Sequence, residues 1–316
     1  MGDIALPLLA GKRHTNVLRF TVSHTAGFTI TPEITRHVGC PHTATWDWGD
    51  GSALETGDSM SHAYAAGTYN VTLRLPRADR WLAGINMSYD RVVGDALLAL
   101  RGCRNLTNIT LPTNAGLNSA HSLATLRGWW PLLTYLYLAS TQSLITGTLA
   151  DLPAGMEYLS LSDTQSTITG ALADLPVGMT TLHLGRTQST ITGALADLPV
   201  GMEYLSLRNT QSAITGGGAA TSRKLTTVRL DSLGLDQPAV DSILWSLYQA
   251  AITPRTETGG TINLGGTNAA PSGTFQAAAS CPVTEDTDGA EIAHELLNDG
   301  CGEGFNKWAT VTITAP

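Results

Sequence analysis

Residues 141–163 read TQSLITGTLADLPAGMEYLSLSD, and residues 164–186 and 187–209 repeat that text almost unchanged as TQSTITGALADLPVGMTTLHLGR and TQSTITGALADLPVGMEYLSLRN. A threonine therefore recurs every 23 residues, at Thr141, Thr164, Thr187 and Thr210. A fixed period of about 20–29 residues indicates a solenoid in which each repeat stacks on the next. Each repeat then buries its apolar face against its neighbours, so we expect function on the long exposed faces rather than in a catalytic pocket.

The apolar spacing of these repeats continues on both sides of them. Pairs of apolar residues two positions apart recur from residue 81 to the end of the chain. They predict nine parallel strands, stacked about 4.8 Å apart. The first residues of the pairs are Ile85, Ile109, Leu136, Leu159, Leu182, Leu205, Val228, Ile262 and Val311. The outer steps are longer and irregular, as expected of capping repeats that cover the ends of a stack.

The two longest steps, near the C-terminal end, are expected to contain helices. Residues 237–250 follow Asp236, a favourable N-cap, and carry an apolar stripe. Residues 289–298 carry a second stripe, and Gly300 is the expected stop. The return path of the middle repeats is too short for a helix and contains proline. We expect positive φ angles there at Gly147, Gly170 and Gly193.

Residues 14–78 follow a different pattern. Val17–Ser23 and Thr68–Leu75 alternate as strands, with the turn sequence W-D-W-G-D-G-S between them at Trp46–Ser52. The text SHAYAAGTYNVTL follows from Ser61. Together these two motifs resemble the polycystic-kidney-disease (PKD) type of immunoglobulin-like β-sandwich. The resemblance implies an antiparallel sandwich that acts as an adhesive or spacer module.

Two acidic residues of this turn, Asp47 and Asp50, raise the question of a metal site. Two carboxylates are few for a metal, and aspartates in turns commonly accept backbone N–H groups. We therefore expect both to shape the turn, with His62 packed beside it.

Residues 81–316 resemble the leucine-rich-repeat family through their L-x-x-L-x-L register. The spacing T-Q-S-x-I-T-G-x-L-x-D-L-P-x-G-M is similar to bacterial and phage-encoded members. The segment TINLGGTNAAPSG, which follows Gly260, resembles repeat proteins of tailed-phage genomes. Many family members place a ladder asparagine after the strand, where this chain has Thr141 and its equivalents. A hydroxyl can serve the loop backbone there with fewer bonds than an amide.

The expected fold class is mixed β and α/β. An N-terminal extension (residues 1–13) precedes an antiparallel β-sandwich (14–78) and a leucine-rich-repeat solenoid with parallel strands (81–316). Within the solenoid we expect an irregular part (81–133), regular 23-residue repeats (134–230) and a C-terminal cap with helices (231–316).

Composition argues against several classes of function. The net charge is −8 and no basic stripe is visible, so nucleic-acid binding is not expected. The apolar opening Ile4–Ala10 is short, contains Pro7 and follows an acidic residue, so neither a signal peptide nor a membrane span is expected. Synthesis in the cytoplasm follows from this expectation.

The chain has four cysteines, Cys40, Cys103, Cys281 and Cys301, and no C-x-x-C motif that would indicate a zinc ribbon. Cys281 and Cys301 bracket a short segment and could close a disulfide. The alternative is four reduced thiols, mostly buried.

Residues between the leucines face outward on the concave sheet, because side chains alternate along a strand. Tyrosine recurs there and offers a large contact area at low entropic cost, which suits a protein interface or stacking on sugar rings. The alternative is a solvated sheet face whose residues only favour β structure. The candidate binding residues are Tyr135, Tyr137, Glu157, Tyr158, His183, Glu203, Tyr204 and Arg229.

We find no sequence support for catalysis, a metal or a cofactor. His294-Glu295 lacks the second histidine of a zinc protease, and no nucleophile elbow or phosphate loop occurs. The sequence therefore favours a non-enzymatic structural and binding protein.

The favoured setting is the virion surface of a tailed phage, as a capsid decoration or tail-associated protein. Such a protein is made in the host cytoplasm and later displayed outside. Its partners would be virion components or host-surface proteins, and glycans as a further class, without membrane insertion. The alternative is a bacterial cell-surface or secreted adhesin.

Overall fold

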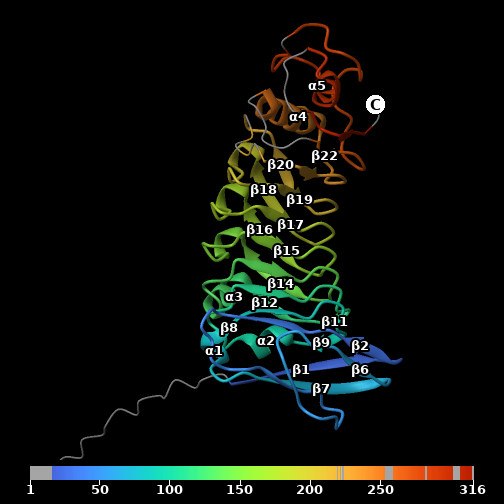
Figure 1. Ribbon diagram of the computed structural model, residues 1–316. Helices are drawn as coiled ribbons and strands as arrows, with labels where there is room; N and C mark the ends of the chain where they lie inside the picture. The colour runs from blue at the N-terminus through green and yellow to red at the C-terminus, as the bar shows by residue number, and fades with distance from the viewer. Residues whose placement is uncertain are drawn as a thin grey trace, which may run out of the picture.

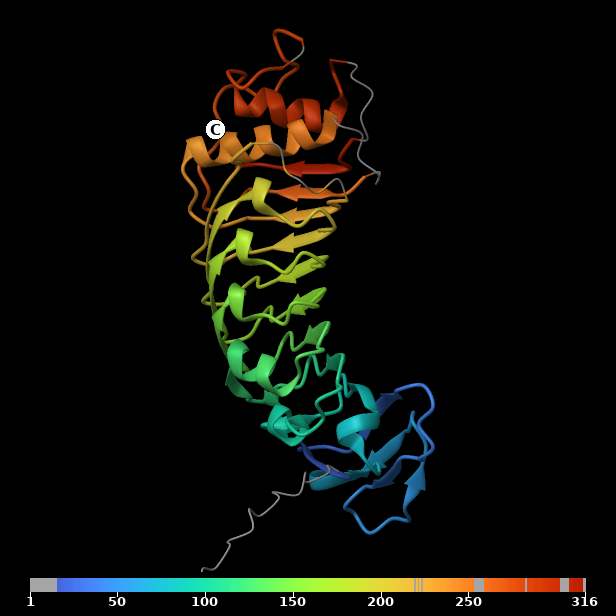
Figure 2. The ribbon, with the colours of Figure 1, turned by 90° about the vertical axis from the view of Figure 1, so that its left-hand side faces the viewer.

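The computed structural model describes residues 16–218, 220, 222, 224–252, 259–281, 283–301 and 307–314. The expected extension, residues 1–13, lies outside this part of the chain. The described residues form one elongated stack that ends in helices α4 (Gln237–Ile252) and α5 (Gly289–Asn298) (Figures 1 and 2). One cluster of buried apolar side chains runs through it from Leu18 to Trp308.

The nine predicted parallel strands are confirmed. Each pairs in register with the strand of the next repeat, so that Leu159 lies beside Leu136 and Leu182. The central residues of the first eight strands are buried, whereas Val311 in β23 is half-buried at the end of the stack. The strands are β8 (Leu82–Asn86), β10 (Asn108–Thr110), β13 (Tyr135–Tyr137), β15 (Tyr158–Ser160), β17 (Thr181–His183), β19 (Tyr204–Ser206), β21 (Thr227–Arg229), β22 (Thr261–Asn263) and β23 (Thr310–Thr312).

A second parallel sheet covers the return path of the repeats and was not predicted. Its five strands pair in parallel along the opposite side of the solenoid, but equivalent residues are staggered, so that Thr146 lies beside Thr167 and Thr169 beside Thr190 (Figure 1). They are β12 (Ala120–Ser122), β14 (Leu144–Thr148), β16 (Thr167–Ala171), β18 (Thr190–Ala194) and β20 (Ala213–Thr215). Each regular repeat is therefore closed by two strands, with the core leucines and isoleucines between them.

A short 3-10 turn follows three of these strands: η1 (Leu149–Asp151), η2 (Leu172–Asp174) and η3 (Leu195–Asp197). The aspartate of each turn accepts the backbone N–H three residues earlier, at 3.1–3.2 Å. The expected positive φ angles are present, at 118°, 114° and 109° for Gly147, Gly170 and Gly193.

Buried hydroxyls line the loop that follows each concave strand of the regular repeats. Thr164 donates to the carbonyl of Leu161 at 2.6 Å, and its Oγ1 lies 2.8 Å from Ser166 Oγ. Ser166 in turn accepts the N–H of Ile145 in the preceding repeat. The threonine contacts recur at Thr141 and Thr187, and Ser189 likewise accepts the N–H of Ile168. Threonine and serine therefore bind the loop backbone at the position where the family commonly has an asparagine. Amides do occupy the equivalent position in two flanking repeats, at Asn114 and Asn268.

The N-terminal residues form antiparallel strands around two stacked indoles. β1 (Val17–His24) pairs with β7 (Gly67–Arg74), which also pairs with β4 (Thr45–Asp47), and β4 pairs with β5 (Glu55–Thr56). A second small sheet joins β2 (Phe28–Ile30) to β6 (His62–Tyr64). Trp46 and Trp48 are fully buried, with ring centroids 5.5 Å apart.

The acidic turn between β4 and β5 has a structural role. Asp47 accepts the N–H of Gly49, and Asp50 accepts the N–H and hydroxyl of Ser52. His62 lies 2.8 Å from Asp50 and stacks on Trp48. The hydrogen bonds from Ser52 and His62 lower the pKa of Asp50. Both carboxylates shape the turn, as the sequence indicated.

The N-terminal strands and the solenoid exchange strands with each other. β3 (Glu33–Arg36) pairs antiparallel with β8 and so becomes the outermost strand of the concave sheet. In the other direction, β9 (Val92–Gly94) pairs with β1, and β11 (Gly116–Leu117) pairs with β9. Backbone hydrogen bonds therefore cross the expected boundary near residue 80 in both directions.

Short helices lie where the repeats are irregular. They are α1 (Ala78–Trp81), α2 (Ala96–Leu100) and α3 (Leu123–Trp129). Trp130, directly after α3, is fully buried and donates to the carbonyl of Leu100 at 3.1 Å. It thereby ties this repeat to the preceding one.

The two predicted C-terminal helices are confirmed. Asp236 caps α4 by accepting the N–H of Ala239 at 3.0 Å. At the end of α5 the left-handed residue is Asp299, with φ 52°, and not the expected Gly300. Aspartate tolerates this conformation because its short polar side chain can bond locally.

A buried carboxylate occupies the ladder position of the first repeat. Asp90 is 1% exposed, and its Oδ1 accepts the N–H of Thr31 at 2.6 Å. Its Oδ2 has no hydrogen-bond partner. Burial raises the pKa of Asp90 to about 7, and the bond from Thr31 opposes this only in part. Asn114, at the same position one repeat later, uses its amide to bond two carbonyls.

We predict that Asp90→Asn removes a pH dependence of folding. A carboxyl whose pKa is raised by folding stabilises the native state below its unfolded pKa of 3.8, and that contribution is lost as the pH rises through about 7. The variant should therefore gain about 1–4 kcal/mol of unfolding free energy at neutral pH and nothing at pH 4. Urea titrations across this range measure the difference. Asn114→Asp is the matched control and should introduce the same dependence; parallel curves for all three proteins would contradict the prediction.

Cys281 and Cys301 form a disulfide, with Cα atoms 5.5 Å apart. It joins the segment before α5 to the residues after it. The buried Glu295 of α5 supports both sides, because its carboxylate accepts the N–H of Ala278 at 3.2 Å and that of Cys301 at 2.9 Å. Cys40 and Cys103 are free thiols, and Cys103 is buried.

Thiol counting tests this bridge. Protein denatured without reductant should react at two thiols, Cys40 and Cys103, and reduced protein at four. In the native state Cys103 should not react, since burial raises its pKa to about 12. Replacing Cys281 and Cys301 by serine should lower stability by about 3 kcal/mol in the loop-entropy model. Four reactive thiols without reductant would exclude the bridge.

Candidate binding surface

Two columns of outward side chains run along the concave sheet, one on each side of the buried leucines. In the first, which we call the tyrosine column, successive strands contribute Thr35, Gly84, Asn108, Tyr135, Tyr158, Thr181, Tyr204, Thr227, Thr261 and Thr310. In the second, the polar column, they contribute Glu33, Asn86, Thr110, Tyr137, Ser160, His183, Ser206, Arg229, Asn263 and Thr312. The surface therefore begins on β3, outside the expected solenoid.

Three tyrosines pack on one another instead of standing apart. The rings of Tyr135 and Tyr158 stack with centroids 4.1 Å apart and an interplanar angle of 12°. Tyr137 meets Tyr158 edge-on at 5.9 Å. Burial, together with the neighbouring Tyr135, raises the pKa of Tyr158 to about 12, so its hydroxyl stays neutral. These three form one aromatic cluster, half-buried on its own sheet.

Tyr204 lies apart from this cluster, because Thr181 occupies the column between Tyr158 and Tyr204. The centroids of its ring and of the His183 imidazole are 5.4 Å apart. Glu157 and Glu203 are exposed at the start of their strands, whereas Arg229 lies at the far end of its own. The eight candidates from the sequence thus divide into four groups. These are the aromatic cluster, the His183–Tyr204 pair, an acidic edge formed by Glu157 and Glu203, and a basic edge at Arg229.

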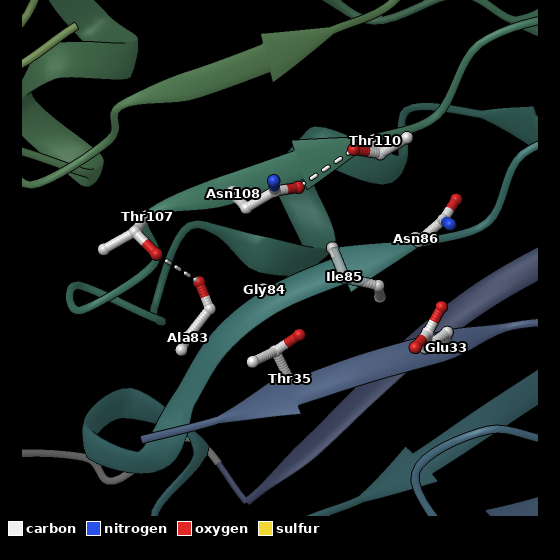
Figure 3. A pocket seen from close by; sticks show the side chains of 9 residues that line it. All are labelled: Glu33, Thr35, Ala83, Gly84, Ile85, Asn86, Thr107, Asn108 and Thr110. Atoms are coloured by element: carbon white, nitrogen blue, oxygen red, sulfur yellow. Dashed lines mark hydrogen bonds between the residues drawn. The ribbon is translucent and has the colours of Figure 1, made fainter. Parts of the chain in front are cut away.

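A hollow opens at the N-terminal end of the concave sheet, between β3, β8 and β10 (Figure 3). Its floor is Gly84, where a Cβ atom would lie 3.3–3.5 Å from Asn108 and Thr35. Thr110 donates to Asn108 Oδ1 at 2.9 Å on one side. Glu33 stands on the other side, on β3. Sequence reasoning missed this hollow, because nothing local to residues 33–36 indicates that they pair with the solenoid.

Sequence reasoning also missed two arginines near His183. Arg208 lies two residues beyond β19, and Arg186 lies in a turn with φ 59°.

The left-handed conformation of Arg186 recurs in other repeats. It is found at Ser140, Asp163, Asn209 and Ser232. A positive φ thus follows each of the five concave strands from β13 to β21, although no glycine marks it there.

Burial and charge keep His183 neutral. Desolvation and the nearby Arg208 lower its pKa to about 4; Arg229 acts in the same direction, and Asp163 opposes them. In the part of the chain that the structure describes, no group of three or more His, Cys, Asp or Glu side chains could hold a metal ion. None of the described helices is long and apolar enough to cross a membrane.

No family model and no curated protein matches this chain. Among solved structures, one match is the leucine-rich-repeat ectodomain of the plant receptor kinase GASSHO1/SCHENGEN3 from Arabidopsis thaliana, in complex with CASPARIAN STRIP INTEGRITY FACTOR 2. It has 16% identity and a TM-score of 0.37, and it covers 59% of this chain and 21% of that one. Another is the plant peptide hormone receptor RGFR1 with RGF2, with 13% identity, a TM-score of 0.33 and coverage of 69% and 38%.

The in-register strands and the buried L-x-x-L-x-L positions give the chain the architecture of a leucine-rich-repeat solenoid. It spans well under half the length of the two plant receptor chains.

We predict that Tyr158 is more important for stability than Tyr204. Tyr158→Ala removes both aromatic contacts of its cluster, whereas Tyr204→Ala removes only the contact with His183. A double-mutant cycle on Tyr135 and Tyr158 should give a coupling of about 0.5–1.5 kcal/mol. Urea unfolding of the two single variants and the double variant measures it. Additive effects would show that the two rings do not stabilise each other.

Proposed function

We propose that this chain is a non-enzymatic recognition protein that binds a protein partner through the concave face of its solenoid. The observation that carries this proposal is the polar column, where stacking places Tyr137, His183 and Arg229 on every second strand, with the buried Ser160 and Ser206 between them. Tyrosine and arginine are enriched at protein interfaces and among the residues that dominate binding energy. The rigid sheet holds them in place, so little conformational entropy is lost on binding.

We further propose that the protein acts on the virion surface of a tailed phage, as a capsid decoration or tail-associated component. The sequence of the repeats and the segment after Gly260 support this through their similarity to phage-encoded repeat proteins. The Cys281–Cys301 disulfide fits a protein that works outside a reducing cytoplasm. Its partners in this setting are other virion proteins or proteins of the host surface, and its net charge of −8 disfavours nucleic acid.

The N-terminal strands serve, in this proposal, as a PKD-type sandwich that attaches the protein to its assembly. The motif W-D-W-G-D-G-S supports the assignment, because its two tryptophans are fully buried and its aspartates form the turn. The attachment role rests on analogy with other short β-modules at chain starts.

The second candidate is a bacterial cell-surface or secreted adhesin. The hollow of Figure 3 favours it, since Glu33, Asn86 and Asn108 offer the donors and acceptors that a sugar needs, beside the aromatic cluster. The disulfide is equally compatible with this setting.

Mass spectrometry of gradient-purified particles distinguishes the two settings. The tryptic peptide of residues 187–208, TQSTITGALADLPVGMEYLSLR, should copurify with particles and remain after a high-salt wash. Recovery of this peptide only from the cell-surface or culture-medium fraction would reject the virion proposal in favour of the adhesin.

A matched pair of variants tests the concave face. Tyr204→Ala should weaken retention on particles by at least about tenfold, because an interfacial tyrosine can contribute about 2 kcal/mol. Val200→Ala, in the same repeat, is the control; Val200 is 67% exposed on the turn before β19 and lies outside both columns. Equal retention of both variants would show that the partner does not bind at Tyr204.

A further inference from the structure

The hollow between β3, β8 and β10 lies outside the aromatic cluster and outside both charged edges of the concave surface (Figure 3). Its volume is about 330 Å³, which is within the range of pockets that hold small ligands. Glu33 and Thr35 at its rim are exposed, and Asn86 and Asn108 are half-buried. A ligand in solution can therefore reach all four side chains.

The floor of the hollow is Gly84, which alone among the residues of the tyrosine column has no side chain. Its in-register neighbours are Thr35 and Asn108, on strands that are about 10 Å apart. A Cβ atom on Gly84 would lie 3.3 Å from Cβ of Asn108 and 3.5 Å from Cβ of Thr35. The hollow has a backbone floor and is bounded on two sides, so it suits a single ring better than a length of polypeptide.

The polar groups that remain free at this hollow are two donors and one acceptor. Oδ1 of Asn86 accepts the N–H and the hydroxyl of Ser88, at 3.1 and 2.6 Å. Oδ1 of Asn108 accepts the hydroxyl of Thr110. The Nδ2 group of each amide forms no hydrogen bond with any residue that the structure describes, and the carboxylate of Glu33 forms no ion pair there. Both amides can therefore donate to a ligand, and Glu33 can accept from it.

An aromatic ring borders the hollow one strand further along the sheet. Tyr135 pairs in register with Asn108, and its ring stacks on Tyr158 with centroids 4.1 Å apart. That separation is close to the strand spacing of about 4.8 Å, so the two rings stack along the direction in which the strands follow one another. The opposite face of Tyr135 is therefore directed toward β10 and the hollow, where it offers an apolar surface to a ligand.

These groups differ in how well they suit each class of ligand. An ammonium or guanidinium group would be attracted by Glu33 but would meet the free N–H groups of Asn86 and Asn108. A carboxylate or phosphate would be repelled by Glu33. A sugar hydroxyl donates and accepts at once, so neighbouring hydroxyls can donate to Glu33 and accept from the two amides. An uncharged sugar ring therefore complements all three groups.

We propose that Glu33, Asn86 and Asn108 form a subsite for one uncharged sugar ring of a glycan, with Gly84 as its floor and Tyr135 as the adjacent stacking surface. This inference goes beyond the proposed function, which requires a protein partner, and it holds for a virion component and for an adhesin alike. Glu33 belongs to the N-terminal strands, whereas both amides belong to the solenoid. The subsite therefore depends on the pairing of β3 with β8, and neither part of the chain forms it alone.

NMR titration of the full-length protein tests the subsite through the side-chain amide resonances of Asn86 and Asn108. The probes are the methyl α- and β-glycosides of glucose, galactose and mannose, with glucuronic acid as the anionic control. At least one neutral glycoside should shift both amide resonances, and glucuronic acid should not, because Glu33 repels its carboxylate. Unmoved resonances with all of the neutral glycosides would overturn the proposal. A shift with polylysine but with none of the glycosides would also overturn it, in favour of a basic protein segment.

Variants of the rim and the floor locate the contact. Glu33→Gln keeps the shape of the side chain but removes its charge, and it should weaken glycoside binding about tenfold. Glu157→Gln, on an exposed residue outside the hollow, is the matched control and should bind as the wild type does. Gly84→Ala places a methyl group in the floor and should weaken binding at least about tenfold, with its melting temperature showing that it is folded. Equal affinity of the wild type and Glu33→Gln would contradict the assignment.

A pair of tyrosine variants tests the stacking surface and separates this subsite from the proposed function. Tyr135→Ala should weaken glycoside binding about fivefold or more, because it removes the ring beside the hollow. Tyr204→Ala should leave glycoside binding unchanged, since β19 lies four strands from β10. Equal losses in both variants would contradict a ligand seated in the hollow. Glycoside binding combined with full particle retention of Tyr204→Ala would refute the proposed function and leave the subsite standing.

Discussion

The structure depends on the in-register stacking of repeats that have no stable core of their own. A regular repeat of 23 residues contributes one concave strand, one strand of the second sheet and a few buried leucines, isoleucines and methionines. None of these can be buried until the next repeat covers them. The backbone pairing that joins repeats is also what aligns the outward columns, so the arrangement of the surface and the stability of the stack depend on one set of hydrogen bonds.

The polar contacts of the interior follow from the same constraint. Each loop between the two sheets turns through a left-handed residue and leaves carbonyls inside the stack. Threonine and serine satisfy them in the regular repeats, asparagine does so in two flanking repeats, and Asp90 occupies the first. A hydroxyl is small enough to fit within a closely stacked loop and can donate and accept at once. This accounts for the constant threonine and serine of the T-Q-S motif without any contact to a ligand.

Much of this fold could be predicted from sequence because its signals are periodic. Leu136 and its equivalents identify all nine concave strands, and Asp236 marks the start of α4. The second sheet was missed because segments such as Thr190–Ala194 are short and carry glycine. The strand exchange was missed because pairing between Glu33–Arg36 and β8 depends on two distant segments. The packing of Tyr158 on Tyr135 depends on side-chain conformation, which position alone does not determine.

The exchange of strands at the N-terminal end makes the two ends of this molecule very different from its middle. β3, β9 and β11 bind the first repeats to the N-terminal strands, and the disulfide lies at the opposite end. Between them lie repeats that are nearly identical in sequence and backbone geometry. A gene that gains or loses one such unit would lengthen or shorten the molecule by one strand spacing, about 4.8 Å, while both ends keep all their contacts. The length of the molecule can therefore change by whole repeats without any change in the contacts that hold its two ends.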